Sequence, residues 1–203
     1  MLFFELLQIA LGNRERLSIV PSADEWTEMY AVSERQAVTG IVLHGIERLK
    51  KLNADHNLSQ RFLLQWIGAG QMIEQRNHLL DERCKELLSN LTSAGLHPAI
   101  LKGQGIAQCY PEALQRLRQS GDINVYVSDG REKAIAYAKS LGQKDIEWDF
   151  KHLHLKVWED TEVEMHYHVE VLLNLWKNRK LQKWFKTHTH CCPLKVVVDY
   201  YKV

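Results

Sequence analysis

One long run of apolar residues at helical spacing constrains the fold more than any other feature of this sequence. Its members recur in steps of three, four and seven residues, the spacing that places side chains on one face of an α-helix. Asn77 interrupts the stripe, and Gly95 follows it in the position of a C-terminal cap. The pattern predicts a single long helix whose apolar face packs in a core. The stripe consists of Leu63, Ile67, Gly70, Ile73, Leu80, Cys84, Leu87 and Leu91.

The chain before this run also has a helical pattern. Residues 1–11 are apolar but contain Glu5, and they lack both a basic start and a small-residue cleavage site. They are therefore interpreted as an amphipathic helix and not as a signal peptide. Residues 23–51 have helical spacing, and a polar break follows at 53–57. We expect residues 1–95 to form a helical N-terminal region.

Beyond residue 95 short alternating segments replace the long periodic run. Alternation of polar and apolar residues is typical of half-buried strands. We therefore predict an α+β protein in which residues 96–203 form an α/β domain. One strand is predicted at 122–127, and two or three more around 145–150, 152–158 and 162–169. Helices are predicted at 130–141 and 171–186.

Alternation also gathers polar side chains on one face of each strand, because successive side chains point to opposite sides of a sheet. Such faces either point to water, as is common in antiparallel sheets, or line a groove rich in carboxylate, amide and imidazole groups. The polar sets are Asp122, Asn124 and Tyr126; His152, His154 and Lys156; and Glu162, Glu164, His166 and His168.

The surroundings of Asp122 favour a site. Ser120 and Gly121 precede it, and a Lys102-Gly103 turn that opens a helical stretch lies upstream. Backbone N–H groups in a glycine turn at a helix N-terminus can cradle phosphate. A carboxylate on a neighbouring strand could hold the Mg²⁺ that accompanies a nucleoside triphosphate.

Four short motifs in order resemble the nucleotidyltransferases of the DNA polymerase β-like superfamily. More narrowly, they are similar to a bacterial branch of uncharacterised nucleotidyltransferases with a leucine-lysine-glycine turn and a glycine-aspartate-isoleucine-aspartate strand. The resemblance extends from about Pro98 to Val169, about a third of the chain. The motifs are Ile100-Leu101-Lys102-Gly103, Tyr110-Pro111, Leu117-Arg118-Gln119-Ser120-Gly121-Asp122-Ile123-Asn124 and Val163-Glu164-Met165-His166.

This resemblance implies a mixed sheet with helices on one side and a site for two Mg²⁺ (or Mn²⁺) ions. Asp122 would be the first metal-binding carboxylate and Glu164 the third. The implied reaction transfers a nucleoside monophosphate from a nucleoside triphosphate to an unknown hydroxyl acceptor, which could be a small molecule, a protein or an RNA. The implied contacts to phosphate or substrate are Lys102, Gly103, Arg118, Ser120 and Gly121.

Asn124 departs from the family pattern, because it stands where the family has its second aspartate. An amide oxygen can coordinate Mg²⁺ but brings no negative charge. The alternative hypothesis is therefore a catalytically weakened or inactive nucleotide-binding or scaffold protein. Members of the family usually continue with more helical sequence, so we also expect a substrate-binding part beyond this chain.

A third hypothesis is a metal-dependent hydrolase in which histidines bind Zn²⁺, since alternate residues of adjacent strands can converge on a metal. Surface histidines are the commoner explanation, because no recognised ligand spacing accompanies them. The tract His188-Thr189-His190-Cys191-Cys192 lacks the second ligand pair of a zinc ribbon and is interpreted as a loop. The candidate ligands are His152, His154, His166 and His168 with Glu162 and Glu164.

Charge and cysteine content limit the partners. Lys and Arg total 26 and Asp and Glu 25, so nothing in the net charge favours nucleic acid or an anionic membrane. Trp176 and Trp184 flank a basic run, which we interpret as a solvated amphipathic helix. Four cysteines without a secretory signal favour reduced thiols in the cytoplasm.

Overall fold

The computed structural model describes residues 2–119 and 121–188. This part of the chain contains eight helices and four strands, which confirms the predicted α+β class. The chain divides into two compact units: Met1–Leu79 with Cys109–Gln119, and Leu80–Gln108 with Ser120–Val203. The predicted phosphate contact Ser120 and the Cys191-Cys192 tract lie outside the described residues.

The first unit is helical. It contains α1 (Leu2–Ala10), α2 (Ala23–Arg35), α3 (Thr39–Lys51), the start of α4 and the short α6 (Glu112–Gln115). Ser22 and Glu25 form a capping box at the start of α2, which satisfies backbone N–H groups that the helix leaves unpaired. The largest fully buried side chains of this core are Trp26 and Trp66.

The residue that interrupts the apolar stripe has a structural role in this unit. The side-chain amide of Asn77 donates to the backbone carbonyl groups of Arg116 and Arg118, at 2.7 and 2.6 Å. Segment 109–119 also approaches α3 closely, because a Cβ atom at Gly40 would lie 2.2 Å from the carbonyl oxygen of Leu117. A polar side chain and a glycine therefore hold this loop against the helices.

The predicted long helix is confirmed as α4 (Gln60–Ser93). Gly95 follows it with a φ of +77°, a left-handed conformation that ends helices and favours glycine. Among the described residues, no helix is both long and apolar enough to span a bilayer.

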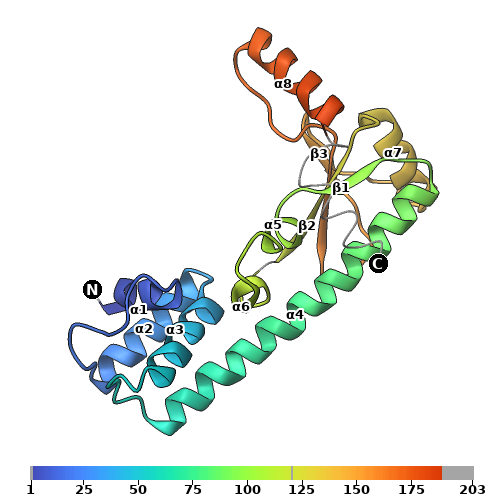
Figure 1. Cartoon of the computed structure of the whole chain (residues 1–203). Helices are drawn as coiled ribbons and strands as arrows, with labels where there is room; N and C mark the ends of the chain where they lie inside the picture. Colours follow the sequence, from blue (N-terminus) through green and yellow to red (C-terminus); the bar gives the residue numbers. More distant parts are fainter. Residues whose placement is uncertain (1, 120, 189–203) are drawn as a thin grey trace. The chain divides into compact units, whose positions relative to one another are not determined.

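The second unit is built on a four-stranded mixed sheet of order β1-β2-β4-β3 (Figure 1). Its strands are β1 (Pro98–Ile100), β2 (Asp122–Val127), β3 (His152–His154) and β4 (Glu162–His166). β2 and β4 are parallel, whereas β1–β2 and β3–β4 are antiparallel. The two motif-bearing strands are therefore neighbours.

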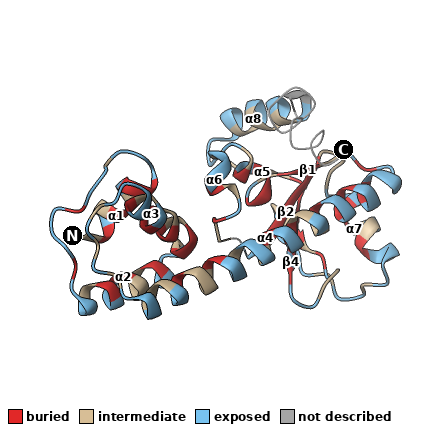
Figure 2. Cartoon of the chain, turned by 60° about the horizontal axis from the view of Figure 1, so that its bottom comes forward, coloured by how far each residue is buried: buried red, intermediate tan, exposed pale blue. Residues whose placement is uncertain are grey.

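One face of this sheet forms the core of the unit. The apolar positions of the strands pack against α4 from Leu80 onward and against α7 (Arg131–Ser140). Figure 2 shows the central strands as buried along their length and α4 as buried on one side only. The core residues are Leu80, Cys84, Leu87, Leu88, Leu91, Leu96, Ile100, Ile123, Val125, Val127, Ala134, Ala138, Leu153, Leu155, Val163, Met165 and Tyr167.

Two of the three later candidate segments form strands, and the prediction of a strand at 145–150 is wrong. That segment makes only an isolated bridge between Trp148 and Leu153. The Asp149 carboxylate instead accepts the backbone N–H groups of Lys151 and His152, at 2.7 and 2.8 Å. This local bonding closes a tight turn between Trp148 and Leu153, the two residues that form the bridge. The predicted final helix is present as α8 (Leu175–His188).

Candidate functional site

The polar face of the sheet is largely buried at its centre. Asn124 is 1% exposed, Tyr126 2% and His166 8%. Buried polar groups are retained where they are hydrogen-bonded to one another or to a ligand. This part of the face therefore does not fit the solvated alternative that alternation left open.

Four side chains from β2 and β4 form one hydrogen-bonded series. Asn124 Nδ2 donates to Asp122 Oδ2 at 2.7 Å. His166 Nε2 lies 2.9 Å from Asn124 Oδ1 and 3.2 Å from Glu164 Oε2. Because both of these oxygens are acceptors, Nε2 carries the proton. The strand register explains the grouping, since Asn124 pairs directly with Glu164.

Burial sets the protonation of His166. Desolvation lowers the pKa of its imidazole, and the nearby Glu164 only partly opposes this effect. The ring is therefore neutral at pH 7, with Nε2 as donor and Nδ1 carrying a lone pair. Nδ1 is buried and has no hydrogen-bond partner within residues 2–119 and 121–188.

Lys102 places a positive charge beside Asp122. Its Nζ is 3.2 Å from Asp122 Oδ2, and the two side chains are 54% and 34% exposed. Partial burial raises the pKa of the Asp122 carboxyl group, but hydrogen bonds from Asn124 and Lys102 outweigh that effect and hold the pKa below its ordinary value. Asp122 is therefore an anion at neutral pH.

These groups adjoin a pocket of about 500 Å³ within the second unit. Asn124, Glu164 and Lys102 line it. Asp122 is not among the lining residues but contacts two of them, since it accepts a hydrogen bond from Asn124 and forms an ion pair with Lys102. Carboxylate and amide oxygens are the ligand types that a hard divalent cation such as Mg²⁺ or Mn²⁺ takes. The lining residues are Leu101, Lys102, Asn124, Lys151, His152, Glu164, His166, Val169 and Glu170.

The predicted glycine turn precedes a very short helix. Gly103 has a φ of +61° and caps α5 (Gln104–Ala107). Gln104 Nε2 donates to Asp81 Oδ1 at 2.6 Å, which ties the turn to α4. Because α5 is a single turn, a phosphate here would depend on the Lys102 charge more than on a helix dipole.

Gly121 and Arg118 are the remaining predicted phosphate contacts that the structure describes. Gly121 is exposed, and a Cβ atom built there would meet nothing within 4 Å. Arg118 belongs to the first unit, and its buried Nη1 has no hydrogen-bond partner among the described residues. Sequence reasoning missed Lys151, which lines the pocket and pairs with Glu170 at 3.0 Å. No local motif marked it.

Three of the six candidate zinc ligands come together. His152, His154 and Glu164 each offer a ligand atom, and these atoms lie within 4.8 Å of one another. His166 is committed to Asn124 and Glu164, and His168 Nδ1 lies 3.0 Å from the carbonyl oxygen of Phe150. Among the described residues, the structure thus reduces the six candidate zinc ligands to His152, His154 and Glu164.

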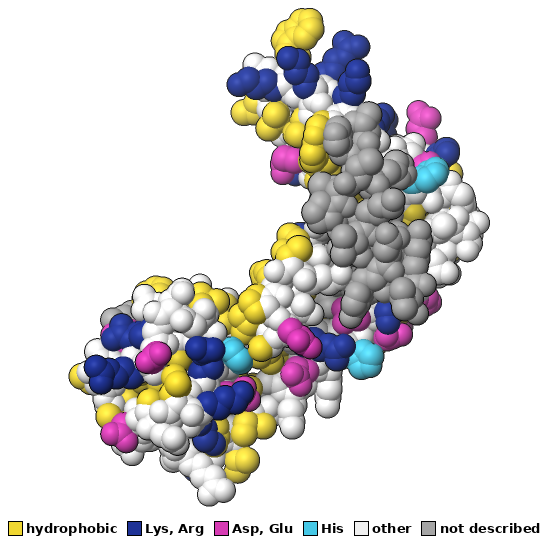
Figure 3. Space-filling view, in the orientation of Figure 1, with side chains coloured by type: hydrophobic (Ala, Val, Ile, Leu, Met, Phe, Trp, Pro, Cys, Tyr) yellow, Lys and Arg dark blue, Asp and Glu magenta, His cyan; other side chains and the backbone are white. Residues whose placement is uncertain are grey.

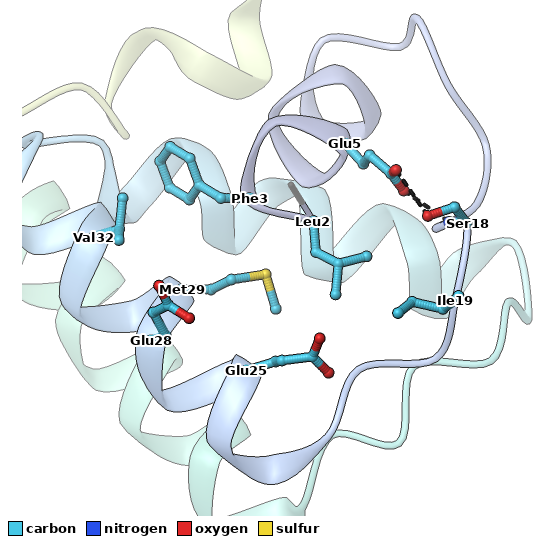
Figure 4. Close-up of a pocket in the computed structure, with 9 residues that line it drawn as sticks. All are labelled: Leu2, Phe3, Glu5, Ser18, Ile19, Glu25, Glu28, Met29 and Val32. Atoms are coloured by element: carbon cyan, nitrogen blue, oxygen red, sulfur yellow. Dashed lines mark hydrogen bonds between the residues drawn. The ribbon is translucent and has the colours of Figure 1, made fainter.

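Figure 4 shows a different pocket, of about 320 Å³, in the helical unit. Leu2, Phe3 and Met29 give it apolar walls. Two of its carboxylates already serve the fold, because Glu5 accepts from Ser18 and Glu25 accepts from Ser22. We assign no chemistry to this pocket.

The C-terminal helix α8 combines basic and aromatic side chains, as the sequence indicates. Trp176 and Trp184 are 79% and 45% exposed. Figure 3 shows Lys and Arg side chains beside apolar ones over this helix. The basic residues of α8 that the structure describes are Lys177, Arg179, Lys180, Lys183 and Lys186.

A mixed sheet with carboxylates on two neighbouring strands, beside a lysine-glycine turn, is the arrangement that the sequence motifs implied for a nucleotidyltransferase. The chain belongs to a family described as uncharacterised nucleotidyltransferases, whose family model matches residues 22–196. This match confirms the resemblance drawn from the four motifs. Searches of curated proteins and of solved structures found no significant match.

Proposed function

We propose that the second unit binds a nucleoside triphosphate with a divalent cation and transfers its nucleoside monophosphate to a hydroxyl acceptor. The observation that carries this proposal is the direct pairing of Asn124 with Glu164 on parallel strands, with Asp122 two residues earlier on β2. This pairing gathers two carboxylates and an amide oxygen beside one pocket. Membership of the family supports the type of reaction.

In the proposed reaction the acceptor oxygen forms a bond to the α-phosphorus, and the bond from that phosphorus to the bridging oxygen breaks. Pyrophosphate leaves, and the hydroxyl proton passes to a base or to solvent. Mg²⁺ or Mn²⁺ held by Asp122, Asn124 and Glu164 would stabilise negative charge on the phosphates and favour ionisation of the hydroxyl.

The chain's own residues divide the remaining tasks. Lys102 would leave its ion pair with Asp122 and contact a phosphate, because a triphosphate carries more negative charge than one carboxylate. Lys151 lines the same pocket and would contact another phosphate oxygen. His166 orients Asn124 and Glu164 through Nε2, so it acts as a positioning residue in this proposal.

One observation favours the alternative of a weakened or inactive nucleotide-binding protein. The Asn124 side chain donates to Asp122 and accepts from His166, so both of its ends are already engaged. A bridging role between two cations would require the amide to give up its bond with His166. Binding without turnover is the result expected from this alternative.

The test is thermal unfolding with a non-hydrolysable ATP analogue, with and without Mg²⁺. A ligand that binds only the folded state stabilises it by about 2.7 kcal/mol at a hundred times its dissociation constant. We expect a Mg²⁺-dependent rise in Tm that Asp122→Asn abolishes. Asp145→Asn is the matched control, because Asp145 is exposed and outside the pocket. The absence of any nucleotide-dependent shift would contradict nucleotide binding and favour the inactive scaffold of the alternative hypothesis.

A further inference from the structure

The two strands at the edge of the sheet bring together a set of side chains that differs from the oxygen-rich group on β2. In the antiparallel β3–β4 pair, His154 lies directly opposite Glu164 and His152 lies opposite His166. Directly opposed residues share a face, so His152, His154 and Glu164 project to the same side. His152 Nε2 is 4.0 Å from Glu164 Oε1.

The side chains of this histidine–glutamate cluster (His152, His154 and Glu164) are accessible. They are 20%, 33% and 22% exposed respectively. Two of the three, His152 and Glu164, line the pocket described above. A small ion from solvent can therefore reach them without unfolding the sheet.

Each of the two histidines has a carboxylate near its Nδ1 atom. A ligating histidine usually donates its second ring N–H to a carboxylate, which fixes the tautomer and raises the basicity of the ligating nitrogen. His154 Nδ1 is 3.0 Å from Glu162 Oε1, which leaves its Nε2 as a lone-pair donor. His152 Nδ1 faces Asp149 Oδ1 at 3.6 Å, a separation too long for a hydrogen bond, while its Nε2 faces Glu164.

We propose that His152, His154 and Glu164 bind a divalent transition-metal ion, of which Zn²⁺ is the reference, and that Mg²⁺ does not replace it. Imidazole nitrogen suits Zn²⁺, whereas Mg²⁺ requires oxygen ligands in octahedral geometry. Two imidazoles and one carboxylate form a known ligand set for catalytic zinc, with a further coordination position left for water or substrate.

The cluster needs only a small contraction to reach coordination geometry. Bond lengths of about 2.0–2.1 Å to a tetrahedral ion place neighbouring ligand atoms about 3.3 Å apart. The ligand atoms now lie within 4.8 Å of one another, so their separations must shorten by at most about 1.5 Å. This site goes beyond the proposed nucleotide site, although Glu164 is a proposed ligand in both.

The experiment uses the full chain, stripped of metal with a chelator that is then removed by dialysis. Zn²⁺ affinity is measured by competition with a chromophoric chelator, and Co²⁺ is added separately to read its visible absorption. We expect one tightly bound Zn²⁺ per chain, and a Co²⁺ spectrum of low-coordinate character. A hundredfold excess of Mg²⁺ should leave both unchanged.

Single substitutions locate the ion. His152→Asn and His154→Asn should each weaken Zn²⁺ binding roughly tenfold or more and remove the Co²⁺ bands, and Glu162→Gln should have a smaller effect. His168→Asn is the matched control, because His168 lies nearby but bonds to the Phe150 carbonyl. Circular dichroism checks folding, and His154, the most exposed of the three, is the safest position to change.

The result that would overturn the proposal is Zn²⁺ binding that is absent, displaced by Mg²⁺, or unchanged in both histidine variants. The nucleotide proposal fails separately. Asp122→Asn should lose the nucleotide-dependent Tm shift but retain Zn²⁺, whereas His154→Asn should lose Zn²⁺ but retain the shift measured with Mg²⁺. Each measurement therefore reports on one site.

Discussion

Asn124 and Glu164 are direct cross-strand partners on the parallel strands β2 and β4, and His166 Nε2 joins their side chains at 2.9 and 3.2 Å. The His166 side chain thus holds Asn124 beside Glu164, the proposed metal ligand two residues earlier on β4. A neutral amide can accept the His166 N–H and donate to Asp122 at once. An aspartate in its place would lose the second of these bonds.

Asn124→Asp is expected to destabilise the metal-free protein and to strengthen its response to Mg²⁺. The new carboxylate would be almost fully buried beside Asp122, and like charges at close range disfavour ionisation. Without metal, we expect the free energy of unfolding to fall by about 1–3 kcal/mol. Urea unfolding with and without Mg²⁺ measures this, and a gain in transfer activity would indicate an intact but weakened site. Equal Mg²⁺ responses in the two proteins would contradict a metal site here.

Glu164→Gln should weaken the Mg²⁺-dependent binding of the nucleotide analogue at least tenfold. The apparent affinity is read from the rise in Tm as the analogue is added. The amide keeps the shape of the side chain but removes the charge that attracts the cation. Glu162→Gln is the control on the same strand and face, since Glu162 has a side chain that is 61% exposed and pairs with His154. Equal effects of the two substitutions would remove Glu164 from the proposed site.

Gly40→Ala should destabilise the helical unit, whereas Gly68→Ala should not. A Cβ atom at Gly40 would meet the Leu117 carbonyl oxygen at 2.2 Å, but one at Gly68 would meet nothing within 4 Å. Overpacking costs about 1–3 kcal/mol, and alanine in an open helix position gains about 0.5–1 kcal/mol over glycine. Urea unfolding measures the change in the free energy of unfolding for each variant, and the two changes should have opposite signs.

The two thiols that the structure describes should differ sharply in reactivity. Burial raises the pKa of Cys84 to about 12, whereas Cys109 is exposed. Only the thiolate reacts with alkylating reagents, so iodoacetamide at pH 8 should modify Cys109 and spare Cys84. Peptide mass spectrometry reads both positions. Labelling of Cys84 at the same rate in native buffer would mean that the sheet–α4 core opens readily.

Asp129→Asn should lower stability at pH 7 but not at strongly acidic pH. The Asp129 side chain is 6% exposed. Burial alone would raise the pKa of its carboxyl group, but bonds from the His97 N–H and Lys133 outweigh this and hold the pKa below 3.8. The unfolded chain therefore binds this proton more readily, and the stabilisation is lost as the pH falls through the folded pKa.

The free energy of unfolding of Asp129→Asn should be about 1–3 kcal/mol lower than that of the native protein at pH 7, because the lost hydrogen bonds are charge-assisted. This difference should persist at pH 5 and shrink below about pH 3.8, the ordinary value for this group. Urea unfolding at pH 7, 5 and 3 measures the trend. A difference that stays constant at pH 3 would show that the charge of Asp129 is not its cause.

Local patterns determined much of this protein in advance. The apolar stripe specified α4, because a period near 3.6 can bury only one face of a helix, and Gly95 specified its end. Alternation likewise separated the core positions of β2 and β4 from Asp122, Asn124 and Glu164. Both patterns depend on neighbours within one segment, which a sequence displays directly.

Only the tertiary structure decided which segments meet. Alternation predicts a strand but not its partner, so the pairing of Asn124 with Glu164, forty positions apart, was not contained in either segment. The same holds for the burial of His166 and the gathering of His152 and His154 around Glu164. Long-range pairing depends on the closure of the intervening loop and on what then covers each face. For that reason the residue types of the site were visible in the sequence, whereas its geometry was not.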